Sequence, residues 1–369
     1  MYNYSLFLPI NHYNRHPLLQ RQVKHGSRSF CFNFKAFSDL MSFMERHFSS
    51  ADQAIIVRSH AKARFLFRTL SAACTLTFVG ALMEPFFPVS AEETQRLAYI
   101  YKRSRPERRL PTNFWIPFFD DSQSPTYEIV FAVEIYLICV EIVQNIISAS
   151  VIPMLVSYMM GQYKIICKYA AMVGRTHRNS NGEVIYYTNI ERNEFVIQTR
   201  RIRLRMCQDE YDQVFVGQLV RFHQKLIKFQ KMFEHFYTPI MFIKVSLSNT
   251  LVALVLYQLC TTDLTSIPSA HLYKLLIEFV SVVFVVYYLC HCSESLDDAQ
   301  QDLTISLATS HWFKCSPAAR RMLVLMFRRS QRPNHLKFYQ GALVLSRAYF
   351  WSVGKLSYSF VNSMKLLKH

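Results

Sequence analysis

Glycine and acidic residues are scarce in this chain of 369 residues, which has 8 Gly and 25 Asp and Glu against 42 Lys and Arg. The sequence has no phosphate-binding glycine loop, no HExxH motif and no paired CxxC motif. Cys290, His291 and Cys292 are too contiguous to converge on one zinc ion without further ligands. These absences argue against an enzyme and predict no cofactor and no metal site.

A disulfide framework and a signal peptide are also missing. The nine cysteines show no regular spacing, and Cys74, Cys139 and Cys260 lie in apolar blocks where a thiol acts as a small hydrophobe. The first thirty residues hold no apolar run of the signal-peptide type. We therefore expect no structural disulfide and no cleavage, and we expect an internal helix to start membrane insertion.

What the chain does have is apolar length combined with positive charge. Hydrophobic residues make up 51% of it, with 30 Phe and 21 Tyr, and its formal net charge is +17. This combination is typical of a multi-pass membrane protein whose cytosolic loops hold the cations. Five apolar blocks reach the roughly 20 residues that a helix needs to cross a bilayer. They are residues 65–87, 127–160, 237–260, 271–290 and 338–364.

Two of the apolar stretches need separate treatment. The second block is longer than one crossing requires and contains Pro153, so we expect a kink there and a helix that continues into the cytosol through residues 161–173. Residues 40–48 are amphipathic but too short to cross a bilayer. We expect this short stretch to lie on the inner membrane surface.

The positions of Lys and Arg predict the orientation. Both are frequent before the first block, between the second and third, and between the fourth and fifth, whereas residues 261–270 hold none. The N-terminus is therefore expected inside and the C-terminus outside. The loop at 88–126 carries both signs of charge and is expected outside. The RRIRLR run at 200–205 indicates a solvated helix face or an anionic-lipid contact rather than a nucleic-acid site.

Several pieces of this sequence occur in an order that resembles the insect odorant receptors. They include LPTNFWIPF (110–118), SPTYEI (124–129), MGQYKIICKY (160–169), VRFHQKLIKFQKMFEHFYTPI (220–240), LCHCSESLDDAQQDLTISLATSHWF (289–313), RRSQRP (328–333) and KLSYSF (355–360). No piece alone is specific, but together they extend from Phe34 to the C-terminus. The resemblance implies an all-α membrane protein with an inside N-terminus. The bundle of about five transmembrane helices here would correspond to the third to seventh of the family's seven.

The apolar blocks and the resemblance together predict seven regions. In order they are an atypical leader (1–33), a cytosolic amphipathic segment (34–64), two membrane helices joined by a long extracellular loop (65–160, with the loop at 88–126), a cytosolic loop and helix extension (161–236), a membrane helix hairpin (237–292), a cytosolic anchor-like segment (293–337) and a pore-lining terminal helix (338–369). The leader stands where the family has its first two helices, so the chain is expected to be incomplete.

The resemblance also implies a function in olfaction and sensory transduction. It implies a receptor in the plasma membrane, on the dendrite of an olfactory neuron, that binds volatile small molecules. With the odorant co-receptor it would form a heterotetrameric, ligand-gated, non-selective cation channel. The ligand-binding residues implied on the surviving helices are Thr77, Gly80, Met83, Ile135, Leu137, Ile138, Tyr273 and Ile277. An apolar stripe of this kind in a membrane helix more often serves ordinary helix packing.

The terminal helix and the segment before it carry the other implied sites. Alignment with the family's pore helix puts Ser363, Leu366 and Leu367 at the gate and its neighbouring filter position, where an apolar ring such as Leu367 closes a narrow pore by dewetting it. Leu323, Leu325 and Phe327 form part of an apolar face with a basic rim, as expected of a subunit interface.

Alternative interpretations remain open at two levels. The polar residues Glu134, Glu141, Gln144, Asn145 and Ser148 follow one stripe of the second block and can contact either a ligand or cation, or a neighbouring helix. For the whole chain, the alternatives are a truncated or mispredicted odorant receptor fragment without function, and a gustatory-type receptor channel. The KLSYSFVNSM ending does not match the TYxxxxxQF-like ending expected of the latter.

Overall fold

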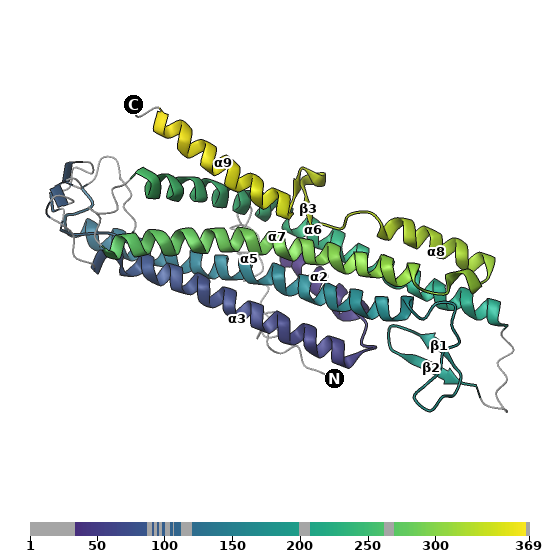
Figure 1. The fold of residues 1–369 in the computed structure, drawn as a ribbon. Helices are drawn as coiled ribbons and strands as arrows, with labels where there is room; N and C mark the ends of the chain where they lie inside the picture. Colours follow the sequence, from purple (N-terminus) through teal and green to yellow (C-terminus); the bar gives the residue numbers. More distant parts are fainter. Residues whose placement is uncertain are drawn as a thin grey trace, which may run out of the picture.

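The computed structural model describes residues 34–86, 120–198, 207–261 and 269–366, together with single residues and short stretches between 91 and 111. Five long helices dominate this part of the chain: α3 (Gln53–Met83), α5 (Thr126–Ala170), α6 (Gln208–Thr261), α7 (Ser269–Ala308) and α9 (Arg347–Leu366). They run alongside one another in an elongated molecule (Figure 1). The 54 residues of α6 extend about 80 Å at 1.5 Å per residue, more than twice the thickness of a hydrocarbon layer.

Shorter elements connect the long helices. They are the helices α2 (Phe34–His47) and α8 (Pro317–Ser330), the 3-10 turns η3 (Glu84–Phe86), η4 (Trp312–Lys314) and η5 (Tyr339–Gly341), and the strands β1 (Ile185–Asn189), β2 (Glu194–Ile197), β3 (Lys337–Phe338) and β4 (Leu343–Val344). The strands form two antiparallel hairpins, β1 with β2 and β3 with β4. In the first, Ile185 pairs with Ile197; in the second, Phe338 pairs with Leu343.

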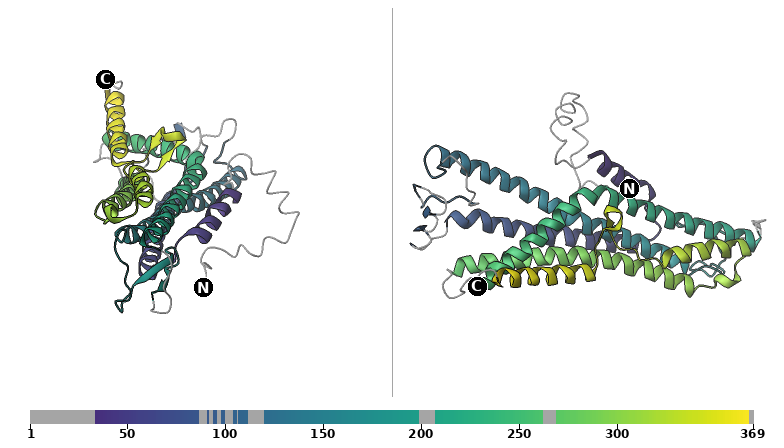
Figure 2. Two further views of the ribbon diagram at one scale, coloured as in Figure 1. Left: turned by 90° about the vertical axis from the view of Figure 1, so that its right-hand side faces the viewer. Right: turned by 90° about the horizontal axis from the view of Figure 1, so that it is seen from above.

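The molecule has two unlike ends. One end holds β1, β2, α8 and the C-terminus of α7, and we call it the hairpin end (Figure 1). At the other end, the tip end, the C-terminal parts of α3, α6 and α9 lie beside the N-terminal parts of α5 and α7 (Figures 1 and 2). The long helices thus run roughly parallel or antiparallel to one another, with α9 beginning near β3 in the middle of the molecule, and this is the arrangement that alternating crossings of a membrane require (Figure 1).

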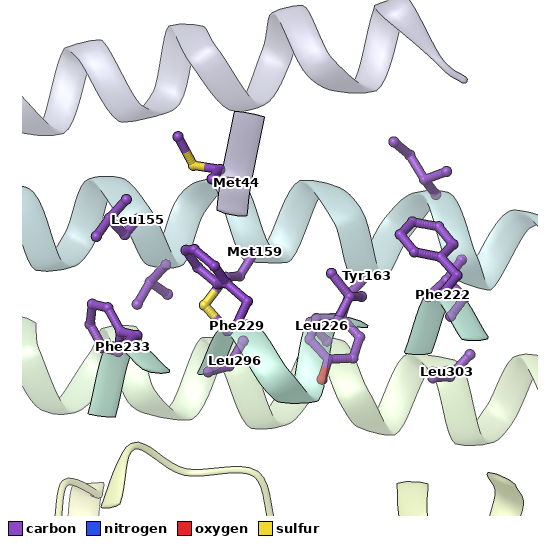
Figure 3. Close-up of a cluster of buried hydrophobic side chains, with 14 of the residues drawn as sticks. Met44, Leu155, Met159, Tyr163, Phe222, Leu226, Phe229, Phe233, Leu296 and Leu303 are labelled. Carbon is purple, nitrogen blue, oxygen red and sulfur yellow. The ribbon is translucent and has the colours of Figure 1, made fainter. Parts of the chain in front are cut away.

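The hydrophobic core lies in the half of the molecule next to the hairpin end, which we call the hairpin half. Side chains of α2, α5, α6 and α7 meet there, and Figure 3 shows Met159, Phe229 and Leu296 among them. Tyr163, Phe222, Phe229 and Phe233 have no more than 1% of their surface exposed. This half therefore buries large apolar side chains as the core of a soluble domain does.

The other half of the molecule, next to the tip end, instead exposes its apolar side chains, and we call it the tip half. The large ones that are exposed there are Leu76, Val79, Met83, Phe86, Ile129, Val133, Tyr136, Leu137, Val140, Val143, Phe242, Leu247, Leu251, Leu254, Tyr273, Leu276, Ile277, Val280 and Phe284. Of the helices in the described ranges, Gln208–Cys260 and Leu275–Ala308 are long and apolar enough on their own to cross a membrane. An apolar surface this extensive marks contact with lipid or with other helices.

Close helix contacts explain two of the few glycines. A Cβ at Gly161 on α5 would lie 2.3 Å from Oγ of Ser59 on α3, so glycine lets these helices approach. Gly174, just after α5, has φ of +71°, and a Cβ there would lie 2.0 Å from the carbonyl oxygen of His311. His311 also donates its backbone N–H to Val173 at 3.1 Å. These two glycines therefore fix how α5 meets α3 and the turn after α7.

One expectation from the sequence is wrong in detail. The fifth apolar block does not begin a helix at residue 338, because β3 and β4 pair there and Tyr339, Gln340 and Gly341 have φ of 51°, 56° and 97°. An α-helix cannot accommodate such left-handed residues. The apolar face of residues 40–48 contacts α6, with the rings of Phe48 and Phe229 4.8 Å apart, and its place on the inner membrane surface stays a prediction. By contrast, α5 does continue past Pro153 to Ala170, as expected; the kink at Pro153 stays a prediction.

Candidate functional site

The residues expected to contact a ligand lie on α3, α5 and α7, and α5 packs against both of the others. Met83, Leu137, Tyr273 and Ile277 are exposed in the tip half, whereas Ile138 is buried and Ile135 is half-buried. Thr77 and Gly80 lie within α3, but their side chains fall outside the described set. The structure thus brings the candidates to one half of the molecule, with most of the described side chains facing outward rather than into a shared interior.

The polar stripe on α5 divides into two parts. Glu134 has only 6% of its surface exposed and lies one turn before the buried Ile138. Glu141 is exposed, and its carbonyl oxygen accepts a hydrogen bond from Nδ2 of Asn145 at 3.1 Å. Gln144 and Ser148 have side chains outside the described set. A buried carboxyl within an apolar span is costly without partners, so Glu134 faces protein rather than lipid.

The helix α9 is buried along one narrow stripe. Val353, Ser357 and Val361 are buried, and their spacing of four residues puts them on one face. This face packs against α6 and α7. The remaining faces are open, with Trp351, Leu356 and Leu366 exposed at 67%, 67% and 78%. Most of the surface of α9 is therefore available to neighbours outside this chain.

Two of the three predicted pore residues can be located on α9. Ser363 and Leu366 are both exposed, and Ser363 donates its hydroxyl hydrogen to the carbonyl oxygen of Ser359 at 3.0 Å. Leu367 lies outside the described residues. Lys355 is also exposed, and because eleven residues make about three helical turns it lies on the same side of α9 as Leu366.

A row of polar side chains on α7 holds the segment that leads into α9. Ser293 donates from Oγ to the carbonyl oxygen of Leu345 at 2.7 Å and accepts from the backbone N–H of Leu336 at 2.8 Å. Asp297 accepts from the backbone N–H of Asn334 at 2.5 Å. Ser293 and Asp297 are one helical turn apart on α7. They bond backbone groups that neither a helix nor a sheet satisfies, and so fix this irregular segment.

The row continues toward the C-terminus of α7 with Gln300, and Glu294 lies directly after Ser293. Gln300, which is 1% exposed, donates from Nε2 to the carbonyl oxygens of Ser330 at 3.0 Å and Arg332 at 2.6 Å. Glu294 accepts from the backbone N–H of Arg347 at 2.7 Å, which satisfies a donor in the first turn of α9. We call Ser293, Asp297 and Gln300 the α7 polar row. It connects the end of α8 to the beginning of α9.

The first turns of α9 have further anchors. Ser346 accepts from the backbone N–H of Tyr349 at 3.1 Å, as an N-cap side chain does. Asn249 on α6 donates from Nδ2 to the hydroxyl oxygen of Tyr349 at 2.8 Å. The ring of Phe350 lies edge-on to Tyr287 of α7, with centroids 5.5 Å apart. The base of α9 is therefore held on both α6 and α7.

Two aromatic groups beside the α7 polar row are buried in uncharged form. The rings of Tyr163 on α5 and His223 on α6 lie edge-on, with centroids 6.4 Å apart, and Nδ2 of Asn334 donates to the Tyr163 hydroxyl oxygen at 3.2 Å. Burial lowers the pKa of His223 to about 4, and the positive charge of Arg329 adds to this effect. Burial also raises the pKa of Tyr163 above its ordinary value. Near neutral pH neither the His223 ring nor the Tyr163 ring carries a charge.

The three residues predicted for a subunit interface lie on α8 in different environments. Leu323 is buried in the chain's own core, with 4% of its surface exposed. Phe327 is half-buried against that core, and Leu325 is 67% exposed. Leu325 is therefore the member of this set that is accessible to another subunit.

The α7 polar row was not identified as functional from the sequence. Its signal was present in the SESLDDAQQ stretch, where Ser293, Asp297 and Gln300 recur at intervals of four and three residues, the spacing of one helix face. Polar side chains at that spacing are also typical of a helix face that is exposed to solvent. The packing of the segment after α8 against α7 is what distinguishes a buried polar face from an exposed one.

Comparisons with known proteins agree on one group. A family model described as 7tm Odorant receptor matches residues 29–358. Odorant receptor 82a of Drosophila melanogaster is 21% identical over 313 residues, which is 85% of this chain and 70% of that protein. Odorant receptor 85b of the same species is 23% identical over 126 residues, which is 34% of this chain and 31% of that protein.

Solved structures of the insect olfactory receptor OR5 from Machilis hrabei share the fold. One superposes with a TM-score of 0.64 at 13% sequence identity and covers 90% of this chain and 74% of that one. Another, in complex with eugenol, gives a TM-score of 0.65 at 12% identity and covers 91% and 75%. The chain thus spans about three quarters of the length of OR5.

Proposed function

Because the chain belongs to the 7tm odorant receptor family, we propose that it is an odorant receptor subunit that binds small volatile organic molecules. Together with the odorant co-receptor it forms a ligand-gated, non-selective cation channel. Its place is the plasma membrane, with the hairpin end in the cytosol and the tip half in the bilayer. The exposed apolar surface of the tip half and the dense core of the hairpin half support this placement.

The observation that carries the channel proposal is the open surface of α9. Among the described residues α9 packs along a single stripe and is anchored at its base, which leaves Leu366 and Ser363 exposed. Four such helices from four subunits can surround a pore, and an apolar residue such as Leu366 or Leu367 then closes it by dewetting. Gating follows when a ligand changes how α9 is held.

The ligand site is proposed in the tip half, among α3, α5 and α7. Met83, Leu137, Tyr273 and Ile277 supply exposed apolar surface, Ile135 and Ile138 lie beside them, and Thr77 and Gly80 belong to the same part of α3. Small-molecule sites are mostly apolar with few polar groups, and the buried Glu134 is one polar group of this region. The OR5 structure in complex with eugenol supports a small molecule as the ligand class.

The test is current measurement in cells that express the chain with the co-receptor. At least one member of a panel of volatile molecules should evoke an inward cation current that neither subunit gives alone. Leu137→Ala should raise the half-effective ligand concentration about tenfold and leave the maximal current unchanged. Leu254→Ala, at another exposed apolar position, is the matched control and should not change it. An equal shift in both variants would exclude the proposed ligand site.

Subunit contact is proposed at Leu325 and Phe327 on α8. Leu325→Ser should abolish co-purification with the co-receptor and leave the folding of this chain intact, since the side chain is 67% exposed. Leu323→Ser should instead lower the yield of folded chain, because Leu323 is buried in its own core. Retained co-purification with Leu325→Ser would move the interface away from α8.

A further inference from the structure

A cavity of about 500 Å³ lies between α6 and the turn after β3, away from the ligand and pore residues. Its lining includes Lys231, Glu234, His235 and Thr238 of α6, and Lys337 and Tyr339 of the turn. Residues 339 and 340 have left-handed backbone conformations without being glycine, which costs energy and occurs mainly where the surroundings require it. The turn is thereby held against α6 with Tyr339 at the cavity.

Positive charge predominates in this cavity. Lys231 and Lys337 are exposed, and neither forms an ion pair within the described ranges of the chain. The carboxylate of Glu234 is already engaged, since its Oε1 accepts from Nε2 of Gln230 at 3.0 Å and from the backbone N–H of Lys337 at 3.2 Å. Thr238 donates its hydroxyl hydrogen to the carbonyl oxygen of Glu234 at 2.6 Å, and Nζ of Lys337 donates to the carbonyl oxygen of Pro333 at 3.4 Å. Because an ammonium group has three N–H donors, Lys231 and Lys337 still have donors for a ligand that is an anion.

The cavity continues into an apolar surface on one side. Lys231, His235, Thr238 and Phe242 follow each other on α6 at intervals of four, three and four residues, so they line one face of the helix. The Phe242 ring lies edge-on to Tyr339, with centroids 5.3 Å apart, and Phe242 is 56% exposed. A ligand in the cavity thus meets cations at one end and exposed aromatic rings at the other.

The same change of character marks the membrane boundary along α6. Before the cavity, Arg221, Lys228 and Lys231 are exposed; after it, the apolar stretch of the helix begins. Aromatic rings such as Tyr339 are frequent at the level of lipid headgroups, and Lys and Arg near the cytosolic leaflet attract anionic lipids. A free phosphate ion would use the cations but not the adjoining Phe242.

We propose that this cavity binds the phosphate headgroup of an anionic phospholipid of the cytosolic leaflet, with Lys231 and Lys337 holding the phosphate and an acyl chain lying along Phe242. The lipid would fasten the β3–β4 hairpin to α6. Since the hairpin leads directly into α9, the lipid acts on the base of the proposed pore helix. The inward position of the cavity rests on the orientation given under Proposed function.

The experiment measures lipid retained by the purified full-length chain. The chain is equilibrated in detergent with phosphatidic acid or with phosphatidylcholine, and bound lipid is counted by native mass spectrometry. Lys231→Gln with Lys337→Gln should weaken phosphatidic acid retention roughly 25-fold, because each Lys near an anionic headgroup contributes about fivefold. Phosphatidylcholine retention should not change. Arg221→Gln with Lys228→Gln removes the same charge outside the cavity and should change retention less than about twofold.

Two further measurements distinguish a phospholipid from free phosphate and test whether loss of retention reflects loss of charge rather than misfolding. Inorganic phosphate at about 10 mM should not displace phosphatidic acid, and Lys231→Arg with Lys337→Arg, which conserves the charge, should restore retention. Equal loss in the two Gln pairs, or displacement by inorganic phosphate, would overturn the proposal. Lipid retention in detergent depends neither on odorant response nor on orientation, so its failure is distinguishable from failure of the proposed function.

Discussion

At the scale of single residues, the most consequential side chains are the buried polar ones at the base of α9. The segment between α8 and α9 lacks regular structure over much of its length, and its backbone groups are satisfied by Ser293, Asp297 and Gln300. A buried backbone donor or acceptor that loses its partner costs about 1–3 kcal/mol. The α7 polar row therefore decides whether α9 begins at a fixed place, which gating requires.

Ser293→Ala tests this role. It removes the acceptor for the N–H of Leu336 and the donor to the carbonyl of Leu345, and should lower the free energy of unfolding by roughly 2 kcal/mol or more. Thermal unfolding of the detergent-solubilised chain measures the change. Ser359→Ala, at an exposed serine of α9, is the control and should leave the midpoint unchanged. Similar midpoints for both variants would remove the α7 polar row from the account.

His223 gives a second prediction at this scale. Its pKa is about 4 in the folded chain against 6.5 without burial, so between these values the unfolded chain binds more protons and stability falls as the pH falls. At about 1.4 kcal/mol per pH unit, the loss from pH 6.5 to 5 is roughly 2 kcal/mol. His223→Gln should reduce this dependence, and His235→Gln, at an exposed residue of the same helix, should not.

Other histidines contribute to the remaining pH dependence. Burial also lowers the pKa of His47, His60 and His177, so His223→Gln should leave a residual slope of the same sign. Unfolding midpoints at pH 7.5 and 5.0 for wild type and both variants provide the comparison. An unchanged pH dependence in His223→Gln would show that this imidazole does not stay neutral in the fold.

At the scale of elements, α9 combines two surfaces with separate roles. The stripe of Val353, Ser357 and Val361 packs against other helices of this chain, whereas the exposed faces of α9 are proposed to contact the pore and the other subunits. Val353→Asn buries an unpaired amide and should lower the unfolding free energy by about 2 kcal/mol. Leu356→Asn, at a 67% exposed position, should leave unfolding unchanged and reduce the evoked current of the complex. Loss of stability with Leu356→Asn alone would contradict this division.

The sequence predicts the long helices better than the connections between them. Apolar length identifies the cores of α3, α5, α6, α7 and α9, because a membrane span must satisfy its backbone internally. Apolar length does not show that α6 begins at Gln208. The first part of α6 is amphipathic and is stabilised by contacts with α2 and α5, which the sequence does not reveal. The β3–β4 hairpin is missed for a similar reason, since its turn residues Tyr339 and Gln340 carry no turn signal.

Site residues follow the same pattern. Alignment with the family's pore helix placed Leu366 at a position that is exposed in the structure, and the apolar face expected to form a subunit interface included the exposed Leu325 and the buried Leu323. Helix periodicity puts Leu323 and Leu325 on different faces of α8, but it does not show which face is buried, because contacts with α6 and α7 set that. Spacing along a helix predicts which residues share a face, but the neighbouring helices determine what that face meets.

At the scale of the whole molecule, the two halves are suited to different surroundings. The hairpin half buries its large side chains, and the tip half exposes them. With the proposed orientation, tags at the two termini, before Asn3 and after His369, should be accessible from opposite sides of intact cells, the C-terminal tag from outside. Antibody staining before and after permeabilisation measures this. Staining of both tags on one side would contradict the odd number of crossings.

The central claim is that this chain contributes α9 to a ligand-gated cation pore, and ion selectivity of the evoked current tests it most directly. The chain and the co-receptor are expressed together, surface delivery is verified by labelling, and the relative permeability of calcium and sodium is obtained from reversal potentials. Leu366→Glu should increase the calcium permeability, because a carboxylate ring in the pore attracts divalent cations. Leu356→Glu, at an exposed position half of the helix nearer its base, should leave it unchanged. An evoked current whose selectivity is the same with Leu366→Glu as with the unmodified chain would contradict the account.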